Sequence, residues 1–162
     1  MKHITLATTA LLALSTALNA ATLKLNFEDL DNYTDFSLQG LSEEKTKNIF
    51  VKEVKRSLRL KKIVGEDRKL EITFDNIDMA GDIQPWRNRQ NSDIRYVEGI
   101  YPPSMDFKYT LRDPSGAIVA EGEESIKDLN FDFGITSIGN SHFKYEMTLL
   151  EDWARQTLKS SE

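Results

Sequence analysis

Short segments of alternating apolar and polar residues are the feature of this sequence that most restricts its fold. They occupy residues 21–27, 70–74, 105–111 and 117–126, and we expect a further short strand at residues 94–97. Alternation with a period of two puts one face of a β-strand in the core and the other in water. The sequence therefore predicts a sheet that is apolar on one face, and this face needs a second layer to cover it.

Two segments with helical spacing are predicted to supply that second layer. The first begins at Ser42, a residue type that caps helices, carries apolar residues at helical spacing over residues 50–58 and stops at Gly65. The second follows Asn140 or Ser141, either of which can cap it. We therefore expect a two-layer α+β domain, with a mostly antiparallel sheet of four to five strands and two helices on one face.

Turn residues connect two of the predicted strands. The sequence Asp113-Pro114-Ser115-Gly116 is typical of a tight turn, so the strands on either side should form an antiparallel hairpin. The strand at residues 70–74 is expected to extend towards Met79, with a change of face near Asn76. No repeat and no linker divides the remainder, and residues 21–162 are predicted to form a single globular domain.

The first twenty residues have the layout of a secretory signal peptide. Lys2 gives a basic start, an apolar run extends from Ile4 to Leu18, and small residues close the segment at Ala20. We expect cleavage after Ala20, although Leu18 is larger than the usual residue two positions earlier and cleavage after Ala21 stays open. The protein is therefore predicted to be exported to the periplasm.

A membrane anchor is the alternative to a cleaved leader. The apolar run is shorter than the ~18 to 20 residues that a spanning helix needs, and we expect no transmembrane segment in the mature chain.

The chain has no cysteine, which excludes disulfides, thiolate metal ligands and a lipidated cysteine. If the domain enters an oxidising compartment, its core must then hold it together without disulfides.

The sequence lacks the residues of several common catalytic sites. Of its two histidines, His3 and His142, only His142 belongs to the mature chain, and no G-x-S-x-G motif accompanies it. Glycine motifs that bind nucleotide phosphates are also missing from the sequence. We therefore assign no catalytic residue, metal or cofactor. A pair of carboxylates acting on a glycan has no such signature, and this class stays open.

Acidic residues around Gly81 allow two interpretations. In a helix–loop–helix calcium site, Gly81 would take the sixth place, and the fifth and twelfth places would need oxygen ligands. Ala80 and Arg87 occupy these two places, and Arg87 carries a positive charge. We expect instead that Asp78 and Asp82 cap a turn at the end of a strand.

Positive charge is concentrated in the first predicted helix. Residues 43–69 hold ten lysines and arginines and five acidic residues, although the whole chain has a net charge of -5. One interpretation is a basic helix over residues 43–64 that binds an anionic envelope component, such as a lipid head group. The other, which we favour, is a solvated face that pairs with the acidic remainder. We expect no nucleic-acid partner, because the chain is acidic overall.

The stretch from Pro85 to Pro103 is the best candidate site. Its aromatic and guanidinium groups are of the types that anchor interfaces, stack on sugars and bind carboxylate or phosphate. The alternative, which we slightly favour, is a long loop held by Trp86 on the core and by an ion pair between Asp93 and a neighbouring arginine. The candidate binding residues are Trp86, Arg87, Asp93, Arg95 and Tyr101, with Asp78 and Asp82 beside them.

Several short motifs, each weak alone, are distinctive together. They are Asp78-Met79-Ala80-Gly81-Asp82, Pro85-Trp86-Arg87, Asp93-Ile94-Arg95, Ile100-Tyr101-Pro102-Pro103, Glu121-Gly122-Glu123-Glu124 with Asp128-Leu129, and Tyr145-Glu146 followed by Leu149-Leu150-Glu151-Asp152-Trp153. In these motifs the chain resembles an uncharacterised family of exported bacterial proteins, the domain of unknown function 3016. The resemblance covers nearly the whole mature chain and implies an exported, single-domain protein. It implies no catalytic residue.

These observations favour a small, non-catalytic binding or interaction module of the cell envelope, with the segment from Trp86 to Tyr101 as its surface. The alternative is a hydrolase that acts on an envelope glycan through carboxylates and arginine. It predicts that Asp78, Asp82 or Asp93 converge in one pocket and that at least one has a strongly shifted pKa. A third hypothesis is an assembly factor whose basic helix docks on an anionic partner.

Overall fold

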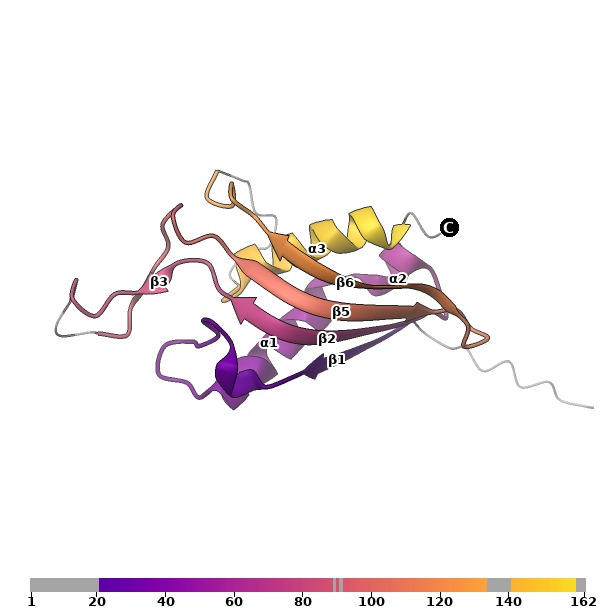
Figure 1. Ribbon diagram of the computed structural model, residues 1–162, viewed down its shortest axis with the longest axis horizontal. Helices are drawn as coiled ribbons and strands as arrows, with labels where there is room; N and C mark the ends of the chain where they lie inside the picture. The colour runs from indigo at the N-terminus through magenta and orange to yellow at the C-terminus, as the bar shows by residue number, and fades with distance from the viewer. Residues whose placement is uncertain (1–20, 89, 91, 134–140, 160–162) are drawn as a thin grey trace, which may run out of the picture.

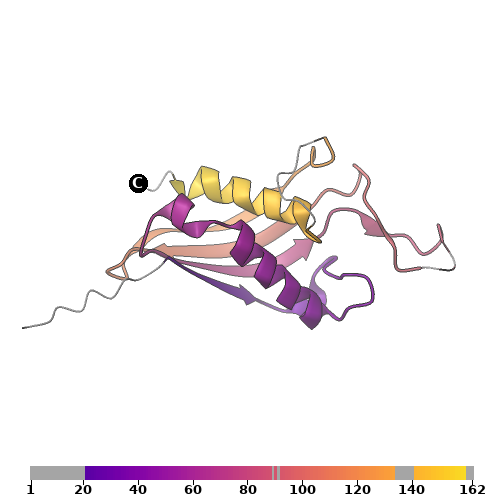
Figure 2. The ribbon, with the colours of Figure 1, turned by 180° about the vertical axis from the view of Figure 1, so that it is seen from behind.

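The computed structural model describes residues 21–88, 90, 92–133 and 141–159. Within these ranges, a four-stranded sheet and the helices packed on one of its faces form two layers (Figures 1 and 2). The elements are β1 (Thr22–Phe27), the short 3-10 helix η1 (Leu30–Asn32), α1 (Glu43–Ser57), α2 (Leu60–Val64), β2 (Lys69–Asp78), β3 (Asp82–Ile83), β4 (Arg95–Tyr96), β5 (Ser104–Arg112), β6 (Ile118–Lys127) and α3 (Lys144–Thr157).

The four long strands form one mixed sheet in the order β1-β2-β5-β6. β1 runs parallel to β2, and the connection between them carries α1 and α2, whereas the other two pairs are antiparallel. The predicted turn joins β5 to β6, and in it Asp113 Oδ1 accepts hydrogen bonds from the backbone N–H groups of Ser115 and Ala117. The predicted two-layer α+β domain with a mostly antiparallel sheet is confirmed.

The alternation in the sequence corresponds to one buried and one more exposed face of the sheet. In β2, Ile72 and Phe74 are buried, and the pairing with β5 shifts between Phe74 and Asn76, so that Ile77 is buried as well. A bulge adds one residue to a strand and changes the face on which the following side chains lie. The helices cover the buried face, where Phe50 of α1 meets Phe74 edge-to-face at 5.6 Å between ring centres.

The predicted first helix is in fact two helices. α1 begins after Ser42, as predicted, and ends at Ser57, and α2 begins at Leu60, after two intervening residues. Leu58 has a ψ of 84°, outside the helical range, which breaks the helix. Both helices keep apolar side chains in the core. Gly65, with a φ of 86°, ends α2 because glycine takes this conformation without a steric penalty.

The last helix, α3, begins at Lys144, slightly later than predicted. Phe143 takes the N-cap position, and the Ser141 hydroxyl accepts a hydrogen bond from the Phe143 N–H and donates one to Glu53 of α1. These contacts connect the start of α3 to α1. Asn140, the other predicted cap, lies outside the described residues. Nowhere in the described part of the chain is a helix both long enough and apolar enough to cross a membrane.

Residues 80–88, 90 and 92–103, here called the arm, project beyond the end of the sheet (Figure 1). The arm contains a ribbon of two short antiparallel strands, β3 and β4. Gly81 has a φ of 83°, and a side-chain carbon at this position would lie 2.5 Å from the Tyr96 carbonyl oxygen. Only glycine therefore allows the two segments to approach this closely. The strand predicted at residues 94–97 is thus paired, which the sequence did not indicate.

Candidate functional site

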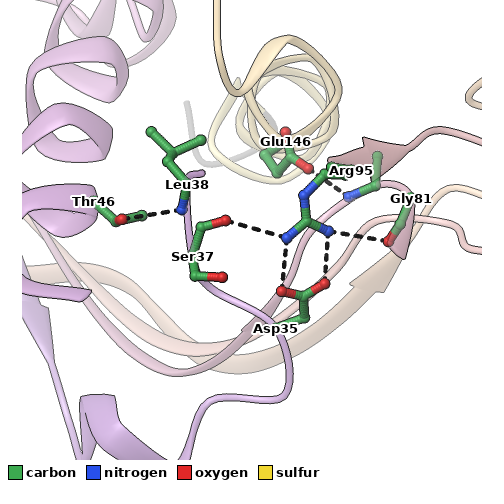
Figure 3. A network of polar contacts seen from close by, with 8 residues as sticks. Asp35, Ser37, Leu38, Thr46, Gly81, Arg95 and Glu146 are labelled. Atoms are coloured by element: carbon green, nitrogen blue, oxygen red, sulfur yellow. Dashed lines mark hydrogen bonds and ion pairs between the residues drawn. The ribbon is translucent and has the colours of Figure 1, made fainter. Parts of the chain in front are cut away.

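Arg95 of β4 fixes the arm to the body of the protein (Figure 3). Its guanidinium group donates two hydrogen bonds to the Asp35 carboxylate, from Nη1 to Oδ2 at 2.6 Å and from Nη2 to Oδ1 at 2.7 Å. It also donates to the carbonyl oxygens of Gly81 and Ser37, at 3.1 and 3.2 Å. Because the guanidinium group is a rigid fork, these bonds hold three chain segments in one geometry.

Asp35 reaches Arg95 because the segment after η1 runs beside the end of β2. Asp35 and Asp78 form an isolated parallel bridge, and Met79 donates its N–H to the Asp35 carbonyl oxygen at 3.0 Å. Leu38, three residues after Asp35, donates its N–H to the Thr46 hydroxyl of α1 at 3.2 Å (Figure 3). Asp35, which accepts the hydrogen bonds of Arg95, is therefore positioned by both the sheet and a helix.

Glu146 of α3 is a buried acid at the base of the arm (Figure 3). The residue is 2% exposed, and its Oε1 accepts a hydrogen bond from the Ala80 N–H at 2.7 Å. Burial raises the pKa of Glu146 to about 7, although the Ala80 N–H and the charge of Arg95 favour the ionised form. At neutral pH, a carboxyl group close to half-protonation therefore holds the start of the arm.

A cavity of about 430 Å³, here called cavity A, opens between the arm and the end of β2. Asp35, Asp78 and Asp82 line it, together with Tyr101 and Lys127. The pKa of Asp78 is raised, mainly by burial and to a smaller extent by the negative charge of Asp35. The carboxylates can accept hydrogen bonds from hydroxyl or amino groups of a ligand, and Lys127 can donate to it.

A second cavity of about 420 Å³, here called cavity B, is lined by Asp93 and Arg95 of the arm and by His142 of the loop before α3. Asp78 and Asp82 do not line it. The three aspartates on which the glycan hydrolase hypothesis depends are therefore divided between two cavities. Across the described residues, no group of three or more His, Cys, Asp or Glu side chains is placed to hold a metal ion.

The arginines of the arm pair with acids that the sequence did not single out. Arg87 Nη2 lies 2.8 Å from Glu98 Oε1, and the Arg87 guanidinium carbon lies 4.9 Å from the centre of the Tyr96 ring. Among the described residues, neither Arg87 nor Arg95 forms the predicted ion pair with Asp93, which instead accepts a hydrogen bond from the neighbouring serine. Those two arginines are already paired, within the arm or with the body of the protein.

Large apolar side chains are exposed at the end of the molecule that carries the arm. Trp86 is 70% exposed, so it does not hold the loop on the core as one interpretation of the sequence required. Ile100, Leu129 and Phe133 are 74%, 67% and 86% exposed, and Val97 is 46% exposed. Single exposed apolar residues are normal, but several on adjoining loops mark an interaction site. We call these five residues the apolar end.

Contacts between loops bring the members of the apolar end near each other. A side-chain carbon at Gly99 would lie 2.6 Å from Asp132 Oδ2, so the loop around Gly99 touches the loop of residues 128–133. The ion pair of Arg87 ties the turn that carries Trp86 to the first of these loops. The apolar end is therefore a set of side chains on loops that brace one another.

The predicted binding residues occupy three neighbouring places. Asp78, Asp82 and Tyr101 line cavity A, and Asp93 and Arg95 line cavity B. Trp86 and Arg87 lie on the exposed part of the arm.

Sequence reasoning missed the partners of the charged residues and two of the five residues of the apolar end. Asp35 lies 60 positions from Arg95, and no local pattern connects residues so far apart. Leu129 and Phe133 lie in an irregular segment without periodicity, so neither an exposed nor a buried position was predicted for them. Their neighbours in the sequence are residues that form turns, and an apolar side chain in a turn is seldom covered by other elements. This pattern could have predicted that both side chains are exposed.

Comparison with known proteins places the chain in one family. A family model described as "Protein of unknown function (DUF3016)" matches residues 21–156, and no curated protein matches the chain. Among solved structures, the PelC dodecamer from Paraburkholderia phytofirmans is similar at 12% identity, with a TM-score of 0.34 over 91% of this chain and 93% of that chain. A variant of the same dodecamer gives 10% identity and a TM-score of 0.34 over 95% and 96%. TM-scores this low transfer no function. The family model, in contrast, matches most of the chain, so the protein belongs to the DUF3016 family of proteins of unknown function.

Proposed function

We propose that the protein is an exported, periplasmic binding module that attaches to another component of the cell envelope through the apolar end and performs no catalysis. The observation that carries this proposal is the exposure of Trp86, Ile100, Leu129 and Phe133 on loops that brace one another. Exposed apolar area of this kind is costly in water and is stabilised by contact with a partner.

The position of the predicted leader supports export. The expected cut follows Ala20, the family model begins its match at residue 21, and β1 begins at Thr22. Removal of residues 1–20 would therefore leave every described strand and helix intact. No disulfide is needed for this domain in an oxidising compartment, since a continuous core joins the sheet to the helices.

The charges around the apolar end favour a protein partner with a basic rim. Asp128 and Asp132 lie beside Leu129 and Phe133 in the chain, and residues 128–133 contain no lysine or arginine to offset them, whereas Glu98 is already paired with Arg87. Asp128 and Asp132 repel phosphate-rich surfaces, and they are complementary to apolar side chains surrounded by lysine and arginine. We therefore propose that the partner is an envelope protein rather than an anionic lipid.

The double substitution Trp86→Ser with Phe133→Ser tests this proposal. We expect at least about a tenfold loss of binding to proteins of the envelope fraction, since aromatic anchors contribute most to such interfaces. The midpoint of thermal unfolding should change by only about 3 °C or less, because both side chains are exposed.

Ile118→Ser with Val119→Ser provides the control, since it removes two exposed apolar side chains from β6 near the hairpin turn, away from the arm. Binding by this control should equal that of the wild-type protein. If the Trp86 and Phe133 variant binds as well as the wild-type protein, the apolar end is not the binding surface.

The glycan hydrolase is a second candidate function, and cavity A is the observation that favours it. Asp78 and Asp82 share this cavity, and the pKa of Asp78 is raised, as a general acid requires. Asp78→Asn should then abolish the release of reducing ends from purified envelope glycans while folding is retained. If neither the wild-type protein nor the variant releases reducing ends, this alternative is excluded for the glycans tested.

A further inference from the structure

A groove of about 520 Å³ lies where β1 begins and α1 gives way to α2. In Figures 1 and 2 this is the end of the molecule opposite the arm. Its floor is apolar, because the half-buried Ala21 and Leu23 meet the buried Leu58 and Leu60 there. Ala21 directly precedes edge strand β1, and Leu23 is the second residue of that strand.

Four cations surround this floor. Lys55, Arg56, Arg59 and Lys62 line the groove and are exposed, and no acidic side chain of the described residues lines it with them. No ion pair between described residues involves these four side chains. Like charges this close repel one another, and a bound anion would relieve that repulsion.

The acids of α1 lie elsewhere, which explains why the groove stays cationic. Glu43 and Glu44 lie in the first turn of the helix, where they face the positive end of its dipole. Glu53 is buried and accepts a hydrogen bond from Ser141 before α3. The predicted pairing of the basic helix with the acidic remainder is therefore not seen for the four cations at the groove.

We propose that this groove binds one molecule of an anionic amphiphile, with its phosphate or carboxylate head on the arginines and lysines and its alkyl chain on the apolar floor. Arginine forks suit a phosphate or carboxylate, and a concave apolar floor suits a single chain better than the flat surface of a bilayer. This site is separate from the apolar end, so either proposal can fail while the other holds.

Calorimetric titration of the mature protein with dodecyl phosphate, kept below its critical micelle concentration, tests the ligand class. Dodecyl maltoside carries the same chain with an uncharged head, and inorganic phosphate carries the head alone. We expect each of these to bind at least about tenfold more weakly than dodecyl phosphate, because each makes only one of the two contacts.

Arg56→Gln with Arg59→Gln tests the position of the site. This variant should bind dodecyl phosphate at least about tenfold more weakly, since charge-assisted hydrogen bonds to the head are lost. The matched control, Lys45→Gln with Lys52→Gln, removes the same charge from exposed positions on the same helix that do not line the groove, and its affinity should stay within about twofold of the wild-type value. Lys55→Gln with Lys62→Gln gives a second groove variant if the first fails to fold.

Four results would overturn the proposal. The first is an equal loss of affinity in the groove variants and in the control, and the second is equal binding of dodecyl phosphate and dodecyl maltoside. The third is binding to vesicles of phosphatidylglycerol without binding of monomeric dodecyl phosphate, which would indicate a membrane-docking face. The fourth is binding of a polyglutamate peptide to the groove without any binding of dodecyl phosphate, which would indicate an acidic protein partner.

Discussion

Arg95 and Arg87 are two arginines of the arm with different surroundings, and they should respond differently to substitution. The side chains of the Arg95–Asp35 pair are 16% and 22% exposed, against 42% and 35% for Arg87 and Glu98. Arg95→Met should lower the free energy of unfolding by about 3 kcal/mol, because it leaves a mostly buried carboxylate and two carbonyl oxygens without their donor. Arg87→Met should cost less than about 1 kcal/mol. Urea unfolding of both variants measures this, and equal losses would contradict the role given to Arg95.

Glu146 should make the stability of the protein depend on pH. Its pKa is about 7 in the folded state, against an ordinary value of 4.5. Between these two pH values the folded state keeps a proton that the unfolded state has lost. The free energy of unfolding should therefore fall as the pH rises, by on the order of 3 kcal/mol in total, and stay level above pH 7.

Glu146→Gln isolates this contribution, because glutamine stays neutral and its oxygen can still accept the Ala80 N–H. The wild-type protein should lose stability relative to the variant from pH 4.5 to pH 7, as measured by urea unfolding at each pH. Parallel curves for the two proteins would show that Glu146 has the same pKa in both states.

Among the elements, the β3–β4 ribbon depends most on a single residue. Gly81→Ala should destabilise the protein by about 2 kcal/mol or more, since the new methyl group meets the Tyr96 carbonyl at 2.5 Å and the backbone has a positive φ. Gly116→Ala is the control: its φ is also positive, 90°, but nothing lies within 4 Å, so it should cost only about 1 kcal/mol. Hydrogen exchange should show faster opening at Tyr96 in the Gly81 variant alone.

The elements also show what a sequence can predict. Strands such as β2 and β5 were found because each buries one face, which leaves an alternating pattern. Ser42 and Gly65 marked the limits of the helical segment, although the Ser42 side chain makes no capping hydrogen bond. The break at Leu58 was missed because this residue is apolar and continues the helical spacing, so no local signal marks the change of its ψ to 84°.

The candidate site was harder to predict than the fold. Its residues belong together through contacts between distant segments, such as Asp35 with Arg95 and Gly99 with Asp132. Composition identified the arm as unusual, because tryptophan, tyrosine and arginine are concentrated in it. It could not separate the residues that brace the arm, such as Arg95, from those that stay exposed, such as Trp86.

The whole molecule has two chemically different ends separated by the length of the sheet (Figure 1). One end carries exposed apolar side chains, two of them beside Asp128 and Asp132, and the other carries a groove lined by four cations. The two proposed sites share no residues, so occupation of one would leave the other free.

Export is a prediction about the whole chain. We expect the protein in the periplasmic fraction, with Ala21 as its first residue, because the leader has a basic start, a short apolar run and a small residue before the cut. Cell fractionation followed by N-terminal sequencing measures both. Recovery from the cytosol with Met1 still attached would contradict export.

The most direct test of the proposed function is photo-crosslinking in living cells, with a photoreactive amino acid placed at position 133 or, as a control, at position 119. Both positions hold exposed apolar residues, Phe133 in the apolar end and Val119 on β6. We predict that position 133 crosslinks to one envelope protein, that Trp86→Ser abolishes this product, and that position 119 gives none. Equal products at both positions, or a product at position 133 that survives Trp86→Ser, would contradict the account of the apolar end as the binding surface.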